Sequence, residues 1–162
     1  MAKVIKSEQS KDVVATPWWG KGAIIYVGLC MGLLWWVLTA LLRQYIVEPL
    51  ACRDLSSATA CINTVGISGN IATVIVAIVG MILLVRTAQP RPVLIAVAAA
   101  ILLWGLGIVV DAFTWWGALL WAVFFYLTSY LLFFLVAKIP RLGGALLVAA
   151  LLLAVVRLLL TL

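Results

Sequence analysis

The chain has 162 residues, of which 67% are hydrophobic and only 10% are charged, so it lacks the polar surface that a water-soluble domain of this size needs. Its net charge of +6 comes from bases that mostly flank apolar segments, which indicates membrane topology and argues against nucleic-acid binding. Histidine is absent and the three cysteines do not cluster with carboxylates, which argues against a zinc or other histidine-ligated metal site.

The apolar residues fall in blocks of about 20, the length of helix that crosses roughly 30 Å of hydrocarbon. Because a helix satisfies its own backbone polar groups, these blocks predict an all-α integral membrane protein, a bundle of five transmembrane helices. Residues 1–21 are expected to form a cytoplasmic tail and residues 22–162 a single helical membrane domain. The expected helices cover residues 22–43, 65–85, 93–112, 115–137 and 142–162.

The bases at alternate ends of these helices predict the orientation of the bundle. Eight bases fall on the side of the N-terminus and three on the other side, so we expect the N-terminus in the cytoplasm and the C-terminus outside. The location would be a plasma (inner) membrane of the bacterial type. The eight bases are Lys3, Lys6, Lys11, Lys21, Arg86, Arg91, Lys138 and Arg141, and the three are Arg43, Arg53 and Arg157.

The first expected helix has an apolar stretch too long for the core of a cleaved signal peptide, so we expect it to remain in the membrane. One of its faces carries the smaller or more polar residues and should contact protein, whereas the opposite, leucine-rich face should contact lipid. The spacing of Gly28 and Gly32 would let a neighbouring backbone approach closely. The protein-facing set is Gly28, Gly32, Trp36, Thr39 and Arg43.

The connection between the first two helices, residues 44–64, is long and is expected to lie outside. It contains Cys52 and Cys61 with eight residues between them, and an oxidising compartment would allow a disulfide. Two free thiols are the alternative, and a catalytic redox pair is not expected because such pairs usually lie two residues apart. Cys30, within the first helix, is expected to be a free thiol that serves as a small packing residue.

The other helices also show small or polar faces, which we expect to point into the bundle. These faces add Asn70, Gly80 and Gly107 to the candidate helix-packing residues Gly28 and Gly32. Hydroxyls of the fourth helix could bond across to the second helix. The expected inward sets are Gly66, Asn70, Thr73, Ala77 and Gly80 in the second helix; Val97, Ala100, Trp104, Gly107 and Asp111 in the third; Ala122, Tyr126, Ser129 and Tyr130 in the fourth; and Gly143, Ala150, Ala154, Arg157 and Thr161 in the fifth.

Three of these faces end in a charge near the expected outer boundary, so Arg43, Asp111 and Arg157 form a candidate outer-rim charge cluster. A charge in a membrane segment is costly enough to need a partner, a water-filled pocket or a route to the interface. In one interpretation Asp111 pairs with one arginine while the other reaches lipid phosphate, and the cluster is structural. In the alternative, the two arginines form an outward-facing site for an anionic headgroup or lipid-linked substrate.

The sequence offers no candidate catalytic, cofactor-binding or metal-ligating residue. Ser129 has no histidine partner, and a second acid for Asp111 would have to come from the outer loop. We therefore expect a non-catalytic accessory, scaffold or self-assembling component that contacts the lipid bilayer and membrane protein partners or copies of itself, but no nucleic acid. The alternative is a transporter subunit, or a protein that handles lipid or an anionic substrate at an outer-facing basic site.

Overall fold

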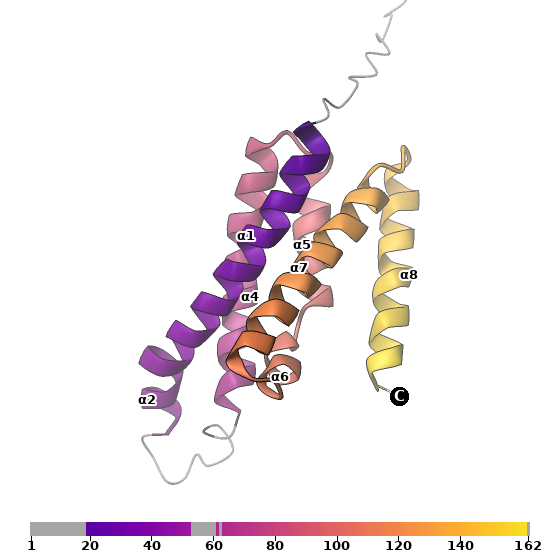
Figure 1. Ribbon diagram of the computed structural model, residues 1–162. Coiled ribbons are helices and arrows are strands. Elements are labelled where there is room, and N and C mark those ends of the chain that lie inside the picture. Colours follow the sequence, from indigo (N-terminus) through magenta and orange to yellow (C-terminus); the bar gives the residue numbers. More distant parts are fainter. Residues whose placement is uncertain (1–18, 53–60, 62, 162) are drawn as a thin grey trace, which may run out of the picture.

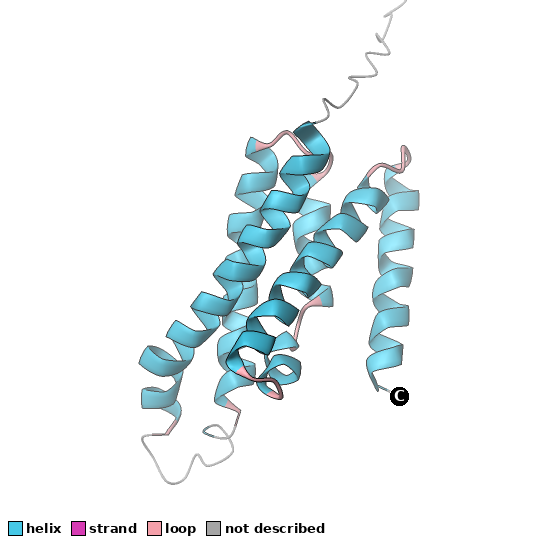
Figure 2. Cartoon of the chain, in the orientation of Figure 1, coloured by secondary structure: helices cyan, strands magenta, loops and turns pink. Residues whose placement is uncertain are grey.

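The computed structural model describes residues 19–52, 61 and 63–161, and these residues form helices joined by short turns, with no β-strand among them (Figures 1 and 2). The expectation of an all-α helical bundle is confirmed. In chain order the elements are α1 (Trp19–Leu42), η1 (Arg43–Val47), α2 (Glu48–Ala51), α4 (Thr64–Arg86), α5 (Pro92–Leu102), α6 (Leu106–Asp111), α7 (Trp115–Ala137) and α8 (Leu142–Thr161).

Three continuous helical stretches in the described part of the chain are long and apolar enough to cross a membrane: Gly22–Ala51, Thr64–Arg86 and Trp115–Ala137. The first continues past residue 43, where we expected it to end, because η1 and α2 extend α1. The wider π-helical turn of η1 ends two residues before Pro49, whose missing N–H cannot continue an α-helical ladder. The expected outer loop is thus helical from residue 44 to residue 51, and its residues 53–60 and 62 lie outside the described residues.

The third apolar segment differs from the single helix that we expected over residues 93–112. It consists of two shorter helices, α5 and α6, separated by a break at Leu103, Trp104 and Gly105. Gly105 adopts a φ of +86°, a left-handed conformation that costs a glycine little because it has no Cβ. Its backbone N–H donates a hydrogen bond to Asn70 Oδ1 on α4 at 3.1 Å. Asn70 thereby accepts a hydrogen bond from a backbone N–H that has no partner in the interrupted helix and would find none in hydrocarbon.

Glycines bring the longest helices into close contact. Gly28 and Gly32 of α1 pack on the backbone of α7, and a Cβ built on Gly32 would lie only 2.6 Å from the Cα of Val123. Gly80 of α4 faces the hydroxyl of Tyr130 on α7, and Gly107 of α6 packs against Gly69 of α4. Each of these contacts is made within one chain, so the expected small-residue positions serve the fold of the monomer.

The core lies between α1, α4 and α7, where the largest fully buried side chains include Trp35, Tyr130 and Phe133. The indole N–H of Trp35 donates to Gly69 O at 3.2 Å and to Thr73 Oγ1 at 2.9 Å, which links α1 to α4. The expected inward set of the fourth helix is confirmed, since all of its members are buried: Ala122, Tyr126, Ser129 and Tyr130. The Ser129 hydroxyl, however, donates to the carbonyl of Phe125 in its own helix rather than across to α4.

The expected inward face of the third segment is only partly right, since Gly107 is buried, and the described members of the fifth segment's expected face are exposed. Val97 and Trp104 are exposed, and α5 instead buries Ile95, Ala96, Ala98 and Ala99. Helix α8 packs against α5 and α7 at the periphery of the bundle (Figure 1), where it buries Ala145 and Ala149 and exposes Gly143, Ala150 and Ala154. Both segments are uniformly apolar and rich in small residues, so residue size alone could not identify the buried face.

Candidate ligand-binding cavity at the Arg43 end

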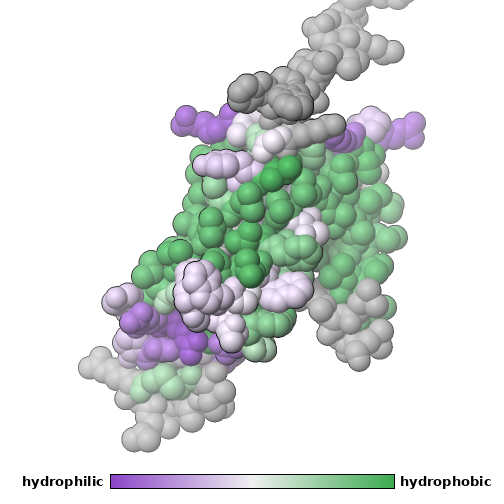
Figure 3. All heavy atoms as spheres, viewed as in Figure 1, coloured by the Kyte–Doolittle hydropathy of each residue, from purple (hydrophilic) through white to green (hydrophobic). Residues whose placement is uncertain are grey.

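Charged residues gather at the two ends of the bundle, with a hydrophobic band between them (Figure 3). One end, which we call the Arg43 end, carries η1, α2 and the connection between α6 and α7. The opposite end, the Arg91 end, carries the start of α1 and the connections α4–α5 and α7–α8 (Figure 1). We had expected the Arg43 end to lie outside the cell.

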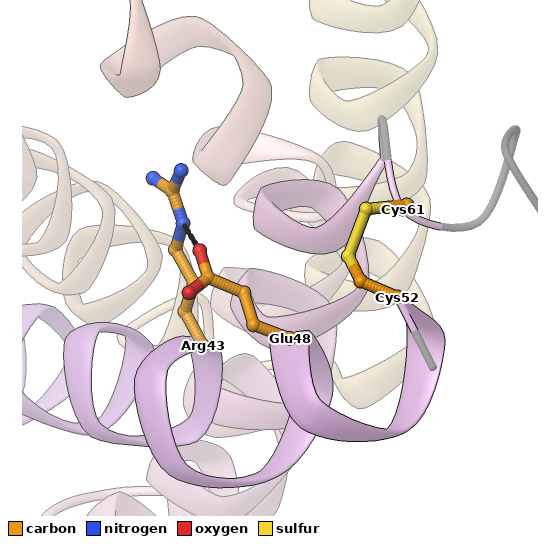
Figure 4. Close-up of a disulfide and its surroundings, with 4 residues drawn as sticks. All are labelled: Arg43, Glu48, Cys52 and Cys61. Carbon is orange, nitrogen blue, oxygen red and sulfur yellow. Dashed lines mark hydrogen bonds and ion pairs between the residues drawn. A yellow bond between two sulfur atoms is a disulfide. The ribbon is translucent and has the colours of Figure 1, made fainter. Parts of the chain in front are cut away.

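Arg43 is the first residue of η1 and contacts two carboxylates. Its Nε donates to Glu48 Oε1 at 2.8 Å (Figure 4). Its Nη1 donates to Asp111 Oδ1 at 3.4 Å. The contact with Glu48 follows from the π-helical turn, in which the N–H of Glu48 bonds the carbonyl of Arg43. This hydrogen bond between residues five apart puts their side chains on one face of the helix. The contact with Asp111 joins η1 to the last residue of α6.

The candidate outer-rim cluster is therefore only partly brought together by the described side chains. Asp111 meets Arg43, one of its two expected partners, whereas the side chain of Arg157 lies outside the described residues. Glu48, from the segment that we expected to be the outer loop, is the nearer partner of Arg43. The side chains of Arg43 and Asp111 are 44% and 53% exposed, so their ion pair contributes little to stability and both groups remain accessible.

A cavity of about 250 Å3 opens beside this ion pair. Its walls come from α1, η1, α4, α6 and α7, and aromatic side chains make up a large part of them. The volume lies just below the usual range for small-molecule sites, which suits a small ligand. The lining residues are Trp35, Trp36, Thr39, Ala40, Arg43, Val65, Gly107, Val110, Asp111, Phe113, Trp115 and Ala118.

Two features of the cavity wall bear on binding. The Thr39 hydroxyl is buried without a hydrogen-bond partner among the described residues, although buried polar groups are nearly always paired. The break before α6 lets Gly107 approach α4 so closely that a Cβ there would lie 2.9 Å from Val65 O. On the α6 side of this break, Gly107, Val110 and Asp111 line the cavity.

A disulfide closes the same end of the molecule. Cys52 and Cys61 are bonded, with their Cα atoms 4.9 Å apart, which confirms the expected bridge (Figure 4). The bond ties the end of α2 to the segment just before α4. Cys30 is a free thiol, as expected. Among the described residues no three side chains of His, Cys, Asp or Glu come together in a way that could hold a metal ion.

Sequence reasoning did not identify the cavity itself. The cavity is lined by five residues that were expected to face the interior of the bundle: Trp36, Thr39, Arg43, Gly107 and Asp111. Sequence reasoning missed Trp35, because nothing in the sequence distinguished its indole from that of the adjacent Trp36. Comparison of the chain with models of protein families, with curated proteins and with solved structures finds no match.

Proposed function

We propose that this chain is an integral membrane protein with five spans, a cytoplasmic N-terminus and an outer C-terminus, in a plasma membrane of the bacterial type. The three long apolar helices support this proposal, with the α5–α6 pair and α8 as the remaining two crossings. Helix α1 begins and α8 ends at opposite ends of the bundle (Figure 1), which fits an odd number of crossings. The bases of the Arg91 end fit a cytoplasmic location.

The function that the geometry supports best is non-covalent binding of a small ligand with a positive charge in the cavity at the Arg43 end. The observation that carries this proposal is the position of Asp111, a half-exposed carboxylate beside a cavity with aromatic walls. A carboxylate attracts a cation directly, and the faces of tryptophan rings attract it through their quadrupoles. The unpartnered Thr39 hydroxyl would pair with a polar group of the ligand.

Two other uses of this site receive less support. An outer-facing basic site would need free guanidinium groups, but Arg43 gives its contacts to Glu48 and Asp111, so the three described charges sum to −1. Acid–base catalysis by a carboxylate dyad would need the two acids to share a proton. Here a guanidinium bridges them instead. We therefore propose a ligand-handling protein, such as a transporter subunit, rather than an enzyme or an anion binder.

Titration of the purified full chain with choline tests this proposal, with the fluorescence of the cavity tryptophans Trp35, Trp36 and Trp115 as the signal. Asp111→Asn should weaken choline binding at least about tenfold, which corresponds to about 1.4 kcal/mol. Glu48→Gln is the matched control, because Glu48 also contacts Arg43 but does not line the cavity. It should change the affinity by less than about twofold.

Inorganic phosphate is the comparison ligand. If phosphate binds and choline does not, the site is basic in character and our choice of ligand charge is wrong. If neither compound alters the fluorescence at millimolar concentration, or if both variants weaken binding equally, the cavity is not the cation site that we propose.

A second candidate function is that of a non-catalytic accessory or scaffold component. The Cys52–Cys61 bridge favours it, because it ties the end of α2 to the segment just before α4 and so fixes two elements of the Arg43 end relative to each other. The glycine faces no longer favour it, since they are used in packing within the chain. A protein partner that co-purifies in fixed stoichiometry, and is lost on Cys52→Ser with Cys61→Ser, would select this function over ligand handling.

A further inference from the structure

A second cavity lies at the opposite side of the fold, in a groove between α5 and α8. Its volume is about 500 Å3 and its walls are almost entirely apolar. Helix α8 makes its main packing contacts with α5 and α7 at the periphery of the bundle, and the groove is open to the surroundings. The lining residues are Arg91, Pro92, Val93, Leu94, Val97, Ala98, Ile101, Leu146, Ala149, Ala150 and Leu153.

Arg91 lines one end of this groove, and its hydrogen bonds reach the connection that leads to Arg141. Arg91 donates from Nη1 to Ile139 O at 2.9 Å and from Nη2 to Pro140 O at 3.0 Å. These bonds hold the guanidinium against the α7–α8 connection. One of the two acceptors, Pro140, is the residue that directly precedes Arg141 in the chain. Arg91 has a left-handed backbone conformation, with a φ of +51°. It directly precedes α5, and its side chain extends to the α7–α8 connection. A guanidinium has five N–H groups, so these two bonds leave donors for an anion.

Among the described side chains, the charges at the Arg91 end have a single sign. The charged side chains described at the Arg91 end are Arg86, Arg91, Lys138 and Arg141, all of them basic. Arg86, Lys138 and Arg141 are exposed. An apolar groove that ends at a cluster of bases matches a molecule with a hydrocarbon chain and an anionic head, because each part then meets its preferred surroundings.

We propose that the groove between α5 and α8 binds one anionic phospholipid, with an acyl chain along the groove and its phosphate on Arg91 and Arg141. This site is separate from the cavity at the Arg43 end, and the proposal does not depend on the function of that cavity. A zwitterionic phospholipid has the same chains but no net charge for the bases to attract. A transmembrane helix of another protein would fill the groove but would supply no anion for the two arginines.

Native mass spectrometry of the full chain in mild detergent tests this proposal, with phosphatidylglycerol and phosphatidylcholine of identical acyl chains as probes. We expect phosphatidylglycerol to be retained at least about tenfold more than phosphatidylcholine, with one molecule bound per chain. Arg141→Gln should remove most of this preference. Arg86→Gln is the matched control, since Arg86 is an exposed base of the same end that belongs to α4 and not to the α7–α8 connection that Arg91 contacts, and it should keep the preference.

Ala150→Leu tests the apolar part of the site, because Ala150 is exposed and lines the groove, so a larger side chain fills space there without reaching the core. It should lower the retention of both lipids. Arg91→Gln also removes the two carbonyl contacts, so a loss of binding in that variant counts only if its melting temperature is unchanged. Equal retention of both lipids by the wild type, equal effects of Arg141→Gln and Arg86→Gln, or a dimer that forms without lipid would each overturn the proposal.

Discussion

At the scale of single residues, Arg43 shows how a charge can be present at a site without being available to a ligand. The residue lies on the expected face of its helix and lines the cavity, yet its guanidinium contacts Glu48 and Asp111. Counting two arginines against one acid suggested an anion site. The contact that reverses this balance, from Glu48, depends on the local change to a π-helical turn.

The exposure of the Arg43–Asp111 pair leads to a prediction about stability. A buried pair would cost several kcal/mol when one partner is removed, but this one is about half exposed. Asp111→Asn should therefore lower the free energy of unfolding by less than about 1 kcal/mol. Equilibrium unfolding in mixed micelles measures this value, and a loss of about 3 kcal/mol or more would mean that the pair is buried in the native membrane.

Gly32 provides a sharper test of packing. Alanine favours helices over glycine by about 1 kcal/mol, but a Cβ here would meet the backbone of Val123, which cannot yield as a flexible side chain would. Gly32→Ala should lower stability by about 1–3 kcal/mol, as measured by thermal unfolding in detergent. Gly143→Ala, at a glycine with nothing within 4 Å, should be neutral or stabilising. Equal effects of the two substitutions would contradict the close approach of α1 and α7.

At the scale of elements, the break between α5 and α6 depends on a partner from another helix. Because Asn70 accepts the Gly105 N–H, the interrupted segment keeps its polar groups paired where lipid could not pair them. The break also decides which residues of α6 reach the cavity, including Gly107 and Asp111. A straight helix over the same residues would place them differently around its axis.

Replacement of Asn70 should loosen this element more than it unfolds the protein. Asn70→Ala should cost about 1–2 kcal/mol and speed hydrogen exchange at the Gly105 amide. Thr128→Val is a suitable control, since the Thr128 hydroxyl bonds only the Phe124 carbonyl of its own helix among the contacts described. Unchanged exchange at Gly105 in the Asn70 variant would show that the hydrogen bond does not protect the break.

At the scale of the whole molecule, the two ends of the bundle differ in charge and in the role that we assign to them. The Arg91 end is basic and carries the proposed lipid site, whereas the Arg43 end has mixed charges, the disulfide and the proposed ligand cavity. If the basic end lies in the cytoplasm, the disulfide lies in an oxidising compartment. The positions of the bases and of the disulfide therefore predict the same orientation.

Accessibility labelling tests this orientation. In a chain with Cys30→Ser, Lys138→Cys should react with a membrane-impermeant thiol reagent only after the membrane is opened. Thr114→Cys should react in intact cells, because Thr114 is exposed in the connection at the Arg43 end. The reverse pattern would invert the proposed topology, and reaction of both residues from one side would rule out α7 as a crossing.

The amino-acid sequence was enough to predict the all-helical fold, its long apolar helices, the Cys52–Cys61 bridge and the inward face of α7. Composition, hydropathy and local spacing are enough for these features, since the tyrosines and serine of α7 mark one face clearly. Only the tertiary structure decided the break at Gly105, the buried faces of α5 and α8, and the cavity beside Asp111. These depend on contacts between distant residues, such as the bond between Asn70 and Gly105, and in a chain with 12 glycines no local signal says which one breaks a helix.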